Sequence, residues 1–472
     1  MTDVNAKRKP TGTDRRKTAA AGGATSERTA CTRLSGADGR ESGAPLGIVT
    51  KNSSPPQPNT MDFTLDTGEI LTCRQNKDLS LSIVKSPQQA RAERWALKSV
   101  VNKIMPSSRT AGCMRLIAPV KGQLISKTEI QVHLSAQHNK AFYTGLFTCG
   151  SIWPCPICAS KVSERRRTEL SEALSAAKAL GWQIHLVTLT IPHGKGDDLS
   201  NMKELQQKAL AKLSNGKNSL KNRLLRNGIE QHGYIRAYEV THGQNGWHPH
   251  YHILLFTSGC TSQQIQSLYA PAWQKACVSV GLPMPSDKHG CTVQNGNEAS
   301  RYVTKWGLED EMTKANTKVT KRKGVTPFGL LRAYLHEDDP EYRPDYAAQL
   351  FRTYAKAMKS ARQLHWSVGL RLKLAMAPEL SDQQLAEQVT DERSIHVASI
   401  TFQQWKAIYK AKAEAHILTA AESIPQGKGY FLAQIINGYV EREKAKGGGN
   451  HASGRGSPLP VSSSTIVEPL SD

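Results

Sequence analysis

The chain has 472 residues, enough for a well-buried core and for two or three domains. Its formal net charge of +22, with a pI near 9.6, indicates a polyanionic partner, most commonly nucleic acid. The sequence has no apolar stretch close to the ~20 residues that span a bilayer. Its start is basic and polar with no apolar segment behind it. We therefore expect a cytoplasmic protein with no membrane partner.

Both ends of the chain have the composition of flexible tails. Residues 1–80 are expected to form a disordered basic tail, because their first part is rich in Gly, Ser, Thr, Ala, Lys and Arg. The basic clusters there are either simply solvated or provide a weak, sequence-independent grip on DNA. Residues 445–472, which include GGGNHASGRGSPLPVSSS, are expected to form a second tail.

Between the tails, helix and strand patterns alternate. Residues 159–180 predict an amphipathic helix that ends at Gly181. Residues 182–191, WQIHLVTLTI, predict a buried strand. A basic helix is expected over 199–227, and its Lys and Arg side chains either contact DNA or form a solvated face.

Two further strands, 233–242 and 247–256, are separated by the turn GQNG at 243–246, which predicts an antiparallel hairpin. Because strands and helices are interspersed and neighbouring strands are joined by a hairpin, we expect an α+β fold with a central antiparallel sheet and flanking helices. Three more stretches have helical patterns: 261–280, 298–314 and about 346–390.

These patterns divide the chain between its tails into three regions. A Cys-rich region with a helix is expected over 81–180, and a catalytic domain over 181–375. Residues 376–444 are expected to form a helical C-terminal region.

The residues HPHYHILLF at 248–256 form the most informative motif. His248, His250 and His252 alternate along the predicted strand, so their side chains share one face. Neutral imidazole is a common ligand for divalent metals, and a rigid strand preorganises such a site. The motif therefore predicts a metal site. The alternative is three histidines that only satisfy hydrogen bonds.

A metal bound by His250 and His252 needs a third ligand, for which His248 and Glu239 are the candidates. Glu239 lies on the preceding strand, which the hairpin brings alongside. We favour Glu239, because a mixed nitrogen and oxygen site suits Mg²⁺ or Mn²⁺, the hard cations of phosphoryl transfer. Glu239 could instead be a cross-strand charge partner.

The sequence EASRYVTKW at 298–306 places Glu298, Tyr302 and Lys305 on one helix face. A tyrosine there could attack a phosphodiester and form a covalent phosphotyrosine. The carboxylate could activate water to release that link, and the lysine could stabilise charge on phosphorus. The alternative is ordinary amphipathic packing.

A cluster of cysteines precedes the first predicted helix. Cys149, Cys155 and Cys158 have the spacing C-x5-C-x2-C, a pattern typical of structural zinc. The fourth ligand is expected to be Cys113, the nearest upstream cysteine, and His185 is the weaker candidate because it lies inside a strand. A redox pair or unrelated buried thiols are the alternatives.

In order and content, these motifs resemble the plasmid rolling-circle replication initiators of the single-tyrosine HUH endonuclease superfamily. The resemblance covers roughly residues 85–375, including TPFGLL at 326–331 and ARQLHWSVGL at 361–370. The first family motif corresponds to VTLT at 187–190, the second to the histidine strand and the third to the tyrosine helix. The resemblance puts His250 and His252 in the paired-histidine positions.

The resemblance implies nicking and joining of DNA at a plasmid origin. Tyr302 would attack a phosphodiester and stay joined to the 5′ end, leaving a 3′-OH for polymerase, while the metal polarises the scissile phosphate. Glu298 stands where one branch of the family keeps a carboxylate for the terminating hydrolysis. Related conjugative relaxases usually place the tyrosine before the histidines, and this chain does not.

The chain departs from some relatives in two ways. Two-tyrosine members carry a second tyrosine about one turn away, whereas position 306 here is Trp. No G-x-x-x-x-G-K-[ST] phosphate loop occurs, so unwinding must come from a host helicase. The expected partners are single-stranded or supercoiled origin DNA, that helicase and a host DNA polymerase. A homodimer, in which a partner's tyrosine replaces Glu298 in the last step, remains an alternative.

The basic segment ANTKVTKRKGV at 315–325 is a second candidate DNA contact or a solvated basic stretch. Three other functions compete with a replication initiator. An HUH transposase would act on transposon ends. A non-catalytic DNA-binding regulator would bind the origin without a covalent adduct. A metallohydrolase would use the histidines and leave Tyr302 dispensable.

Overall fold

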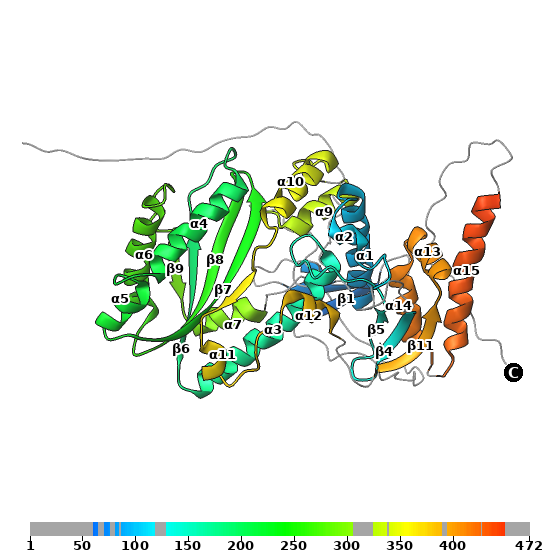
Figure 1. Cartoon of the computed structure of the whole chain (residues 1–472), viewed down its shortest axis with the longest axis horizontal. Helices are drawn as coiled ribbons and strands as arrows, with labels where there is room; N and C mark the ends of the chain where they lie inside the picture. Colours follow the sequence, from blue (N-terminus) through cyan, green and yellow to red (C-terminus); the bar gives the residue numbers. More distant parts are fainter. Residues whose placement is uncertain are drawn as a thin grey trace, which may run out of the picture. The chain divides into compact units, whose positions relative to one another are not determined.

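The structure is a computed structural model (Figure 1). It describes residues 60–64, 70–75, 81–84, 86–118, 129–304, 324–337, 339–388, 394–425 and 427–448. Most of each expected tail lies outside these ranges, and residues 445–448 of the expected C-terminal tail are helical. Part of the range expected as N-terminal tail is paired in a three-stranded antiparallel sheet, whose strands are β1 (Thr60–Thr64), β2 (Ile70–Gln75) and β3 (Leu81–Val84).

A five-stranded antiparallel sheet carries the histidine motif. Its strand order is β10-β7-β8-β6-β9, so the two long hairpin strands lie inside the sheet. The strands are β6 (Gln183–Thr190), β7 (Glu230–Gly243), β8 (Gly246–Ser258), β9 (Cys291–Gln294) and β10 (Leu364–Trp366). The observed α+β fold with antiparallel sheets confirms the expected class.

The predicted hairpin is present as β7 and β8. Gly243 pairs with Gly246, so the turn consists of Gln244 and Asn245. Gly246 has φ +81°, a left-handed conformation that glycine adopts without steric cost. From this turn the register runs back to the pair Glu239 and His250. The turn thus sets which side chains of β7 face the histidines.

The two faces of this sheet contact different helices. Ile253 and Leu255 of β8 belong to the core on the side of α4 (Leu199–Ser214), α5 (Leu220–Arg226) and α6 (Ser262–Val278). Leu254 and Phe256 belong to a second core shared with α3 (Pro156–Ala179) and α7 (Gly296–Thr304). Side chains alternate along a strand, so the histidines lie on the α3 and α7 side.

A second region packs around a three-stranded antiparallel sheet of order β11-β4-β5. Its strands are β4 (Ile130–Ser135), β5 (Ala141–Thr144) and β11 (Ser394–Ile400). Four helices contact these strands or one another: α1 (Pro87–Ile104), α13 (Phe402–Lys410), α14 (Glu414–Ser423) and α15 (Gly429–Gly448).

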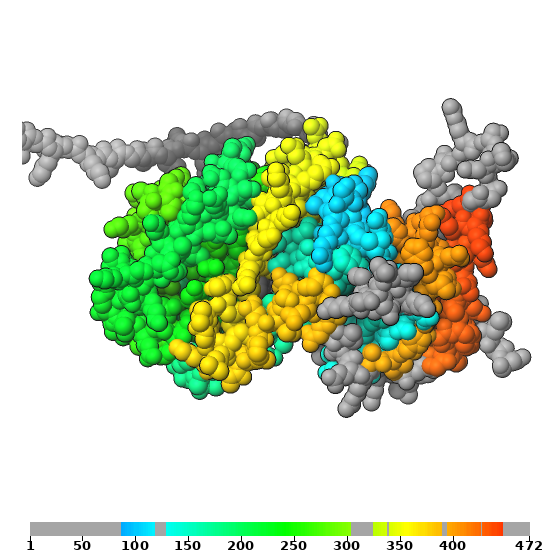
Figure 2. Space-filling model, viewed as in Figure 1, coloured from blue at the N-terminus to red at the C-terminus, as the bar shows by residue number. Residues whose placement is uncertain are grey.

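Three further helices pack against elements of these parts. α9 (Pro327–His336) and α10 (Pro344–Ala357) contact each other, and α10 also contacts α4. The side chain of Lys203 donates a hydrogen bond to the Ala357 carbonyl across that contact. Figure 2 shows the yellow surface of this segment bordering the green surface of α4. α12 (Asp382–Glu387) packs on α3.

Most predicted elements are confirmed, and some were wrong in detail. The region 376–444, expected to be helical, contains the strand β11. The helix expected over 199–227 is divided into α4 and α5, with Gly216 at φ +82° in the break. The stretch expected to be helical from about 346 to 390 contains the strand β10, which pairs with β7. β10 has three residues, too few for a period-two pattern to emerge. No helix of the described ranges combines the length and apolar character needed to cross a membrane.

Candidate active site and cysteine cluster

The three histidines of β8 form a row of half-buried rings. The ring centroids of His248 and His250 are 5.0 Å apart, and those of His250 and His252 are 4.9 Å apart. The residues between them, Pro249 and Tyr251, are buried on the opposite face. The row therefore follows from the alternation of side chains along a strand.

Glu239 joins two of these histidines. Its Oε2 lies 3.5 Å from Nε2 of His250 and 3.6 Å from Nε2 of His252. Ligand atoms about 2.1 Å from one metal ion lie roughly 3.0 to 3.5 Å apart, so the group fits a single divalent cation. One carboxylate and two imidazoles are ligands that divalent metal ions commonly take in proteins.

The rings of His250 and His252 are oriented by their other nitrogens. Nδ1 of His250 lies 3.1 Å from the His248 carbonyl oxygen and therefore donates to it. Nδ1 of His252 lies 3.0 Å from the Thr188 hydroxyl on β6. Both Nε2 atoms are thereby left facing Glu239, as in metal sites whose histidines are fixed by a second hydrogen bond.

Tyr302 of α7 contacts the same group. Its hydroxyl donates a 2.6 Å hydrogen bond to Oε1 of Glu239, and its ring centroid lies 4.6 Å from that of His252. Ala299 and Val303, on the buried face of α7, hold the helix against the sheet. The nucleophile candidate and the metal-site candidates therefore meet, although 50 or more residues separate them in sequence.

The electrostatics of this contact fix both protonation states. Burial, followed by the charge and hydrogen bond of Glu239, raises the pKa of Tyr302 well above 10. Burial alone would raise the pKa of Glu239, but His250 and His252 outweigh it and lower that pKa to about 2. Burial lowers the pKa of His252 to about 4. At neutral pH the site thus holds a neutral tyrosine beside a carboxylate.

Three other candidate residues lie differently. His248 is outside the ligand group, and its Nδ1 instead lies 2.7 Å from Nε2 of His193. Glu298 is one turn before Tyr302 on α7, and its carboxylate pairs with Arg301. Lys305 lies outside the described residues.

Two residues of this site escaped the sequence analysis. Thr188 belongs to the VTLT motif, and its role as partner of His252 depends on the pairing of β6 with β8. His193 follows the end of β6 by three residues and contacts His248. Its position directly behind the first motif was the signal that could have identified it.

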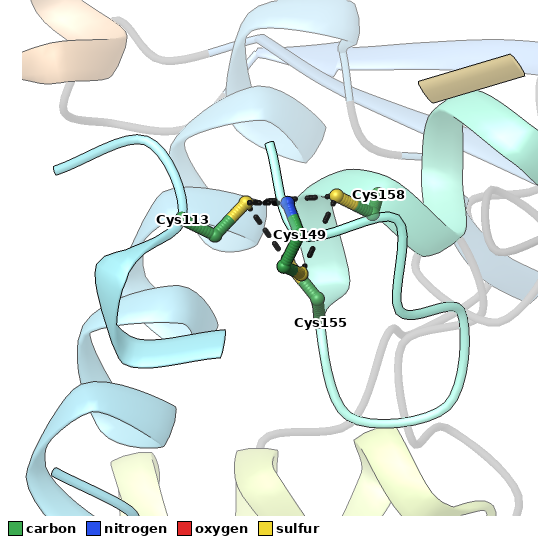
Figure 3. A group of neighbouring side chains, drawn as sticks. All are labelled: Cys113, Cys149, Cys155 and Cys158. Atoms are coloured by element: carbon green, nitrogen blue, oxygen red, sulfur yellow. Dashed lines mark hydrogen bonds between the residues drawn. The ribbon is translucent and has the colours of Figure 1, made fainter. Parts of the chain in front are cut away.

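The four candidate cysteines meet in one buried cluster (Figure 3). Cys155 precedes the first residue of α3, and Cys158 lies in its first turn. Cys149 follows β5, and Cys113 ends the short helix α2 (Arg109–Gly112). The cluster therefore brings two earlier segments of the chain next to the start of α3. This helix also packs against the central sheet.

The sulfur positions fit a tetrahedral metal site. Sγ of Cys158 lies 3.5 Å from that of Cys113 and 3.7 Å from that of Cys149, and Cys113 and Cys155 are also 3.7 Å apart. Thiolates about 2.3 Å from a tetrahedral zinc ion lie about 3.8 Å apart, whereas a disulfide needs about 2 Å. His185 hydrogen-bonds Ser262 and Thr257 instead and is not part of the cluster.

The basic helices do not flank the histidine row on its own face. The basic helix expected at 199–227 forms α4 and α5, which pack on the opposite face of the sheet. Most of the segment 315–325 lies outside the described residues. Any DNA contact from α4 would therefore be separate from the site around Tyr302.

Comparison with known proteins finds similarity to replication proteins. Residues 146–277 match the model of a family described as replication protein, a range that contains Glu239, His250 and His252. The chain is similar to the protein named Protein rep of Streptomyces lividans, with 27% identity over 348 residues, 59% of this chain and 76% of that protein.

A further relative is the protein named Neomycin resistance protein of Streptomyces cyanogenus. It is 31% identical over 142 residues, which cover 25% of this chain and 32% of that protein. No solved structure matches. Together with the family model, the similarity to Protein rep supports the expectation of a replication protein.

Proposed function

We propose that this chain initiates rolling-circle replication of a plasmid by nicking and joining one strand at the origin, as an HUH-type endonuclease. The observation that carries the proposal is the contact between Tyr302 and Glu239, within a group that also contains His250 and His252. A nucleophile candidate beside a candidate metal site is the arrangement that phosphodiester transfer requires.

The first step follows from the hydrogen bond of Tyr302. The tyrosine oxygen attacks the scissile phosphorus, and Glu239 Oε1, already the acceptor at 2.6 Å, lies closest to the released proton. A bond from tyrosine oxygen to phosphorus forms as the phosphorus–O3′ bond breaks. The 5′ end remains on Tyr302, and the other strand end becomes a 3′-OH after protonation.

The metal-site residues would hold Mg²⁺ or Mn²⁺ through Nε2 of both histidines and Oε2 of Glu239. The bound ion would act as a Lewis acid on the scissile phosphate. The two histidines and Glu239 would hold the ion beside the Tyr302 hydroxyl. Thr188 keeps the His252 ring aligned for this purpose.

The remaining residues are assigned roles in the later steps. Glu298, one helical turn from Tyr302, activates water to release the final phosphotyrosine. Lys305 stabilises the charge that develops on phosphorus. The four cysteines hold a structural zinc ion that fixes the start of α3. A host helicase and a host DNA polymerase complete replication.

The experiment that tests this function is a search for the covalent intermediate. The full chain is incubated with Mn²⁺ and a labelled single-stranded oligonucleotide that spans the origin of its own plasmid, then run on a denaturing protein gel. We expect a labelled band at the protein's mass, absent for Tyr302→Phe and retained for Tyr346→Phe, an exposed tyrosine of α10. Cleavage without a labelled protein band would indicate a metal-only hydrolase. Binding without cleavage would indicate a regulator.

A further inference from the structure

The histidine row extends beyond the candidate metal group. His193 continues it past His248, with ring centroids 4.7 Å apart. Four ring contacts of 4.6 to 5.0 Å thus lead from Tyr302 through the three histidines of β8 to His193. The proposed chemistry uses the end of this row at Tyr302 and gives no role to the end at His248 and His193.

A polar cavity of about 290 Å³ opens at that other end. The β7–β8 turn and Gly324 form its walls beside the two histidines. Gly324 lies close to Thr241, because a Cβ at Gly324 would be 3.1 Å from the Thr241 hydroxyl. The described side chains that line the cavity are uncharged polar groups or histidines: His193, Thr241, Gln244, Asn245 and His248.

The hydrogen bonds of the two histidines determine what the cavity offers a ligand. The Asn245 carbonyl can only accept, so Nδ1 of His193 donates to it at 2.9 Å. Nε2 of His193 must then accept the 2.7 Å bond from Nδ1 of His248. This leaves Nε2 of His248 with a free lone pair, and none of the described residues hydrogen-bonds it.

This set of groups suits a nucleobase better than a phosphate. A phosphate presents only acceptors and is bound by cationic side chains and N–H donors. Among the described residues that line the cavity there is no Lys or Arg, and His248 presents an acceptor. A nucleobase edge combines amino donors with ring and carbonyl acceptors, which Thr, Asn, Gln and neutral His side chains can match.

We propose that this cavity binds a nucleobase of single-stranded DNA next to the scissile phosphate and thereby helps to choose the nick site. The inference rests on the proposed function, because it takes the phosphate to lie at the group of Glu239, His250 and His252. His248 lies two residues from His250 on the same face of β8, and their ring centroids are 5.0 Å apart. The base therefore belongs to a nucleotide that neighbours the cleaved bond.

The test is a binding selection that does not require cleavage. Full-length Tyr302→Phe protein with Mn²⁺ is mixed with a random-sequence pool of single-stranded DNA, and the bound DNA is sequenced. We expect a preferred base at one position, enriched about tenfold or more, and loss of that preference alone in a His193→Ala background. His396→Ala, which changes an exposed histidine of β11, should leave the profile unchanged.

A second variant covers the case in which His193→Ala disturbs folding. Thr241→Val removes only the hydroxyl that lines the cavity and should weaken the same position. An unchanged profile in both cavity variants, or an equal loss at every position in both, would overturn the proposal.

The wild-type chain is assayed in parallel for the covalent adduct. An adduct without any position that depends on His193 refutes the cavity and leaves the nicking reaction standing. A His193-dependent position without an adduct refutes the nicking reaction and retains the cavity as a base-binding site.

Discussion

The hydroxyl of Tyr302 donates a 2.6 Å hydrogen bond to Oε1 of Glu239, and the other oxygen of that carboxylate faces His250 and His252. One side chain therefore connects the nucleophile candidate to the candidate metal ligands. From the sequence, Glu239 was expected to be a metal ligand or a cross-strand charge partner, and Glu298 was expected to be the carboxylate beside the tyrosine. The contact predicts that both metal binding and strand cleavage depend on Glu239.

Replacing Glu239 by Gln tests this dual role. The amide oxygen can still accept from Tyr302, but the negative charge that attracts a divalent cation is gone. We expect the Mn²⁺ affinity of the full chain to fall by tenfold or more, a loss in binding free energy on the order of 1.4 kcal/mol for each tenfold. Adduct formation should fall at least as far. Calorimetric titration with Mn²⁺ and the denaturing gel measure the two effects. Unchanged Mn²⁺ affinity would exclude Glu239 as a ligand.

Thr188→Val tests whether the orientation of His252 matters. Valine keeps the shape of threonine and removes the hydroxyl that lies 3.0 Å from Nδ1 of His252. Loss of such a partner typically reduces metal affinity or activity by about 10- to 100-fold. Thr190→Val is the matched control on the same strand and face, because the Thr190 hydroxyl donates to the His289 carbonyl instead. Equal Mn²⁺ affinities for the two variants would contradict the assignment.

The cysteine cluster predicts one tightly bound zinc ion per chain. Cys158→Ser should lower the zinc content measured by mass spectrometry and reduce the free energy of unfolding by about 4 kcal/mol or more, as loss of a structural metal does. Cys260→Ser is the control, because Cys260 is buried outside the cluster beside the Thr257 hydroxyl. A full zinc content in Cys158→Ser would refute the proposed coordination.

Parts of the site could be predicted because their geometry is local. A two-residue turn between Gly243 and Gly246 sets the hairpin register, so the pairing of Glu239 with His250 follows by counting back along both strands. The shared face of the histidines follows from strand alternation alone. No comparable rule brought Thr188 to His252, because that contact depends on which strand β8 pairs with on its other side.

The position of α7 depended on packing between distant segments. Helical spacing groups Glu298 with Tyr302, but the sheet and α3 decide which side of α7 is buried. They place the hydroxyl of Tyr302 on Glu239 and leave Glu298 paired with Arg301. The edge strand β10 was missed for a similar reason, since its three residues gain their conformation from pairing with β7.

A buried carboxyl far from the site provides a last prediction, on stability. Glu414, the first residue of α14, is only 6% exposed. Burial raises its pKa to about 7, although the charges of Lys98 and Lys412 act in the opposite direction. The unfolded chain loses this proton near pH 4.5, so between pH 4.5 and 7 the folded state holds more protons. The contribution of Glu414 to the free energy of unfolding is therefore complete below pH 4.5 and is lost as the pH rises through 7.

Glu414→Gln should remove this pH dependence, because the amide stays neutral in both states. A difference of about 2.5 pKa units corresponds to about 3 kcal/mol. Relative to the wild type, the free energy of unfolding of the variant should therefore increase by roughly that amount between pH 4.5 and pH 8. Urea unfolding of both proteins at several pH values measures the difference. Glu172→Gln, at an exposed position of α3, should track the wild type throughout. Parallel stability curves for Glu414→Gln and the wild type would show that Glu414 is ionised in the folded protein at neutral pH.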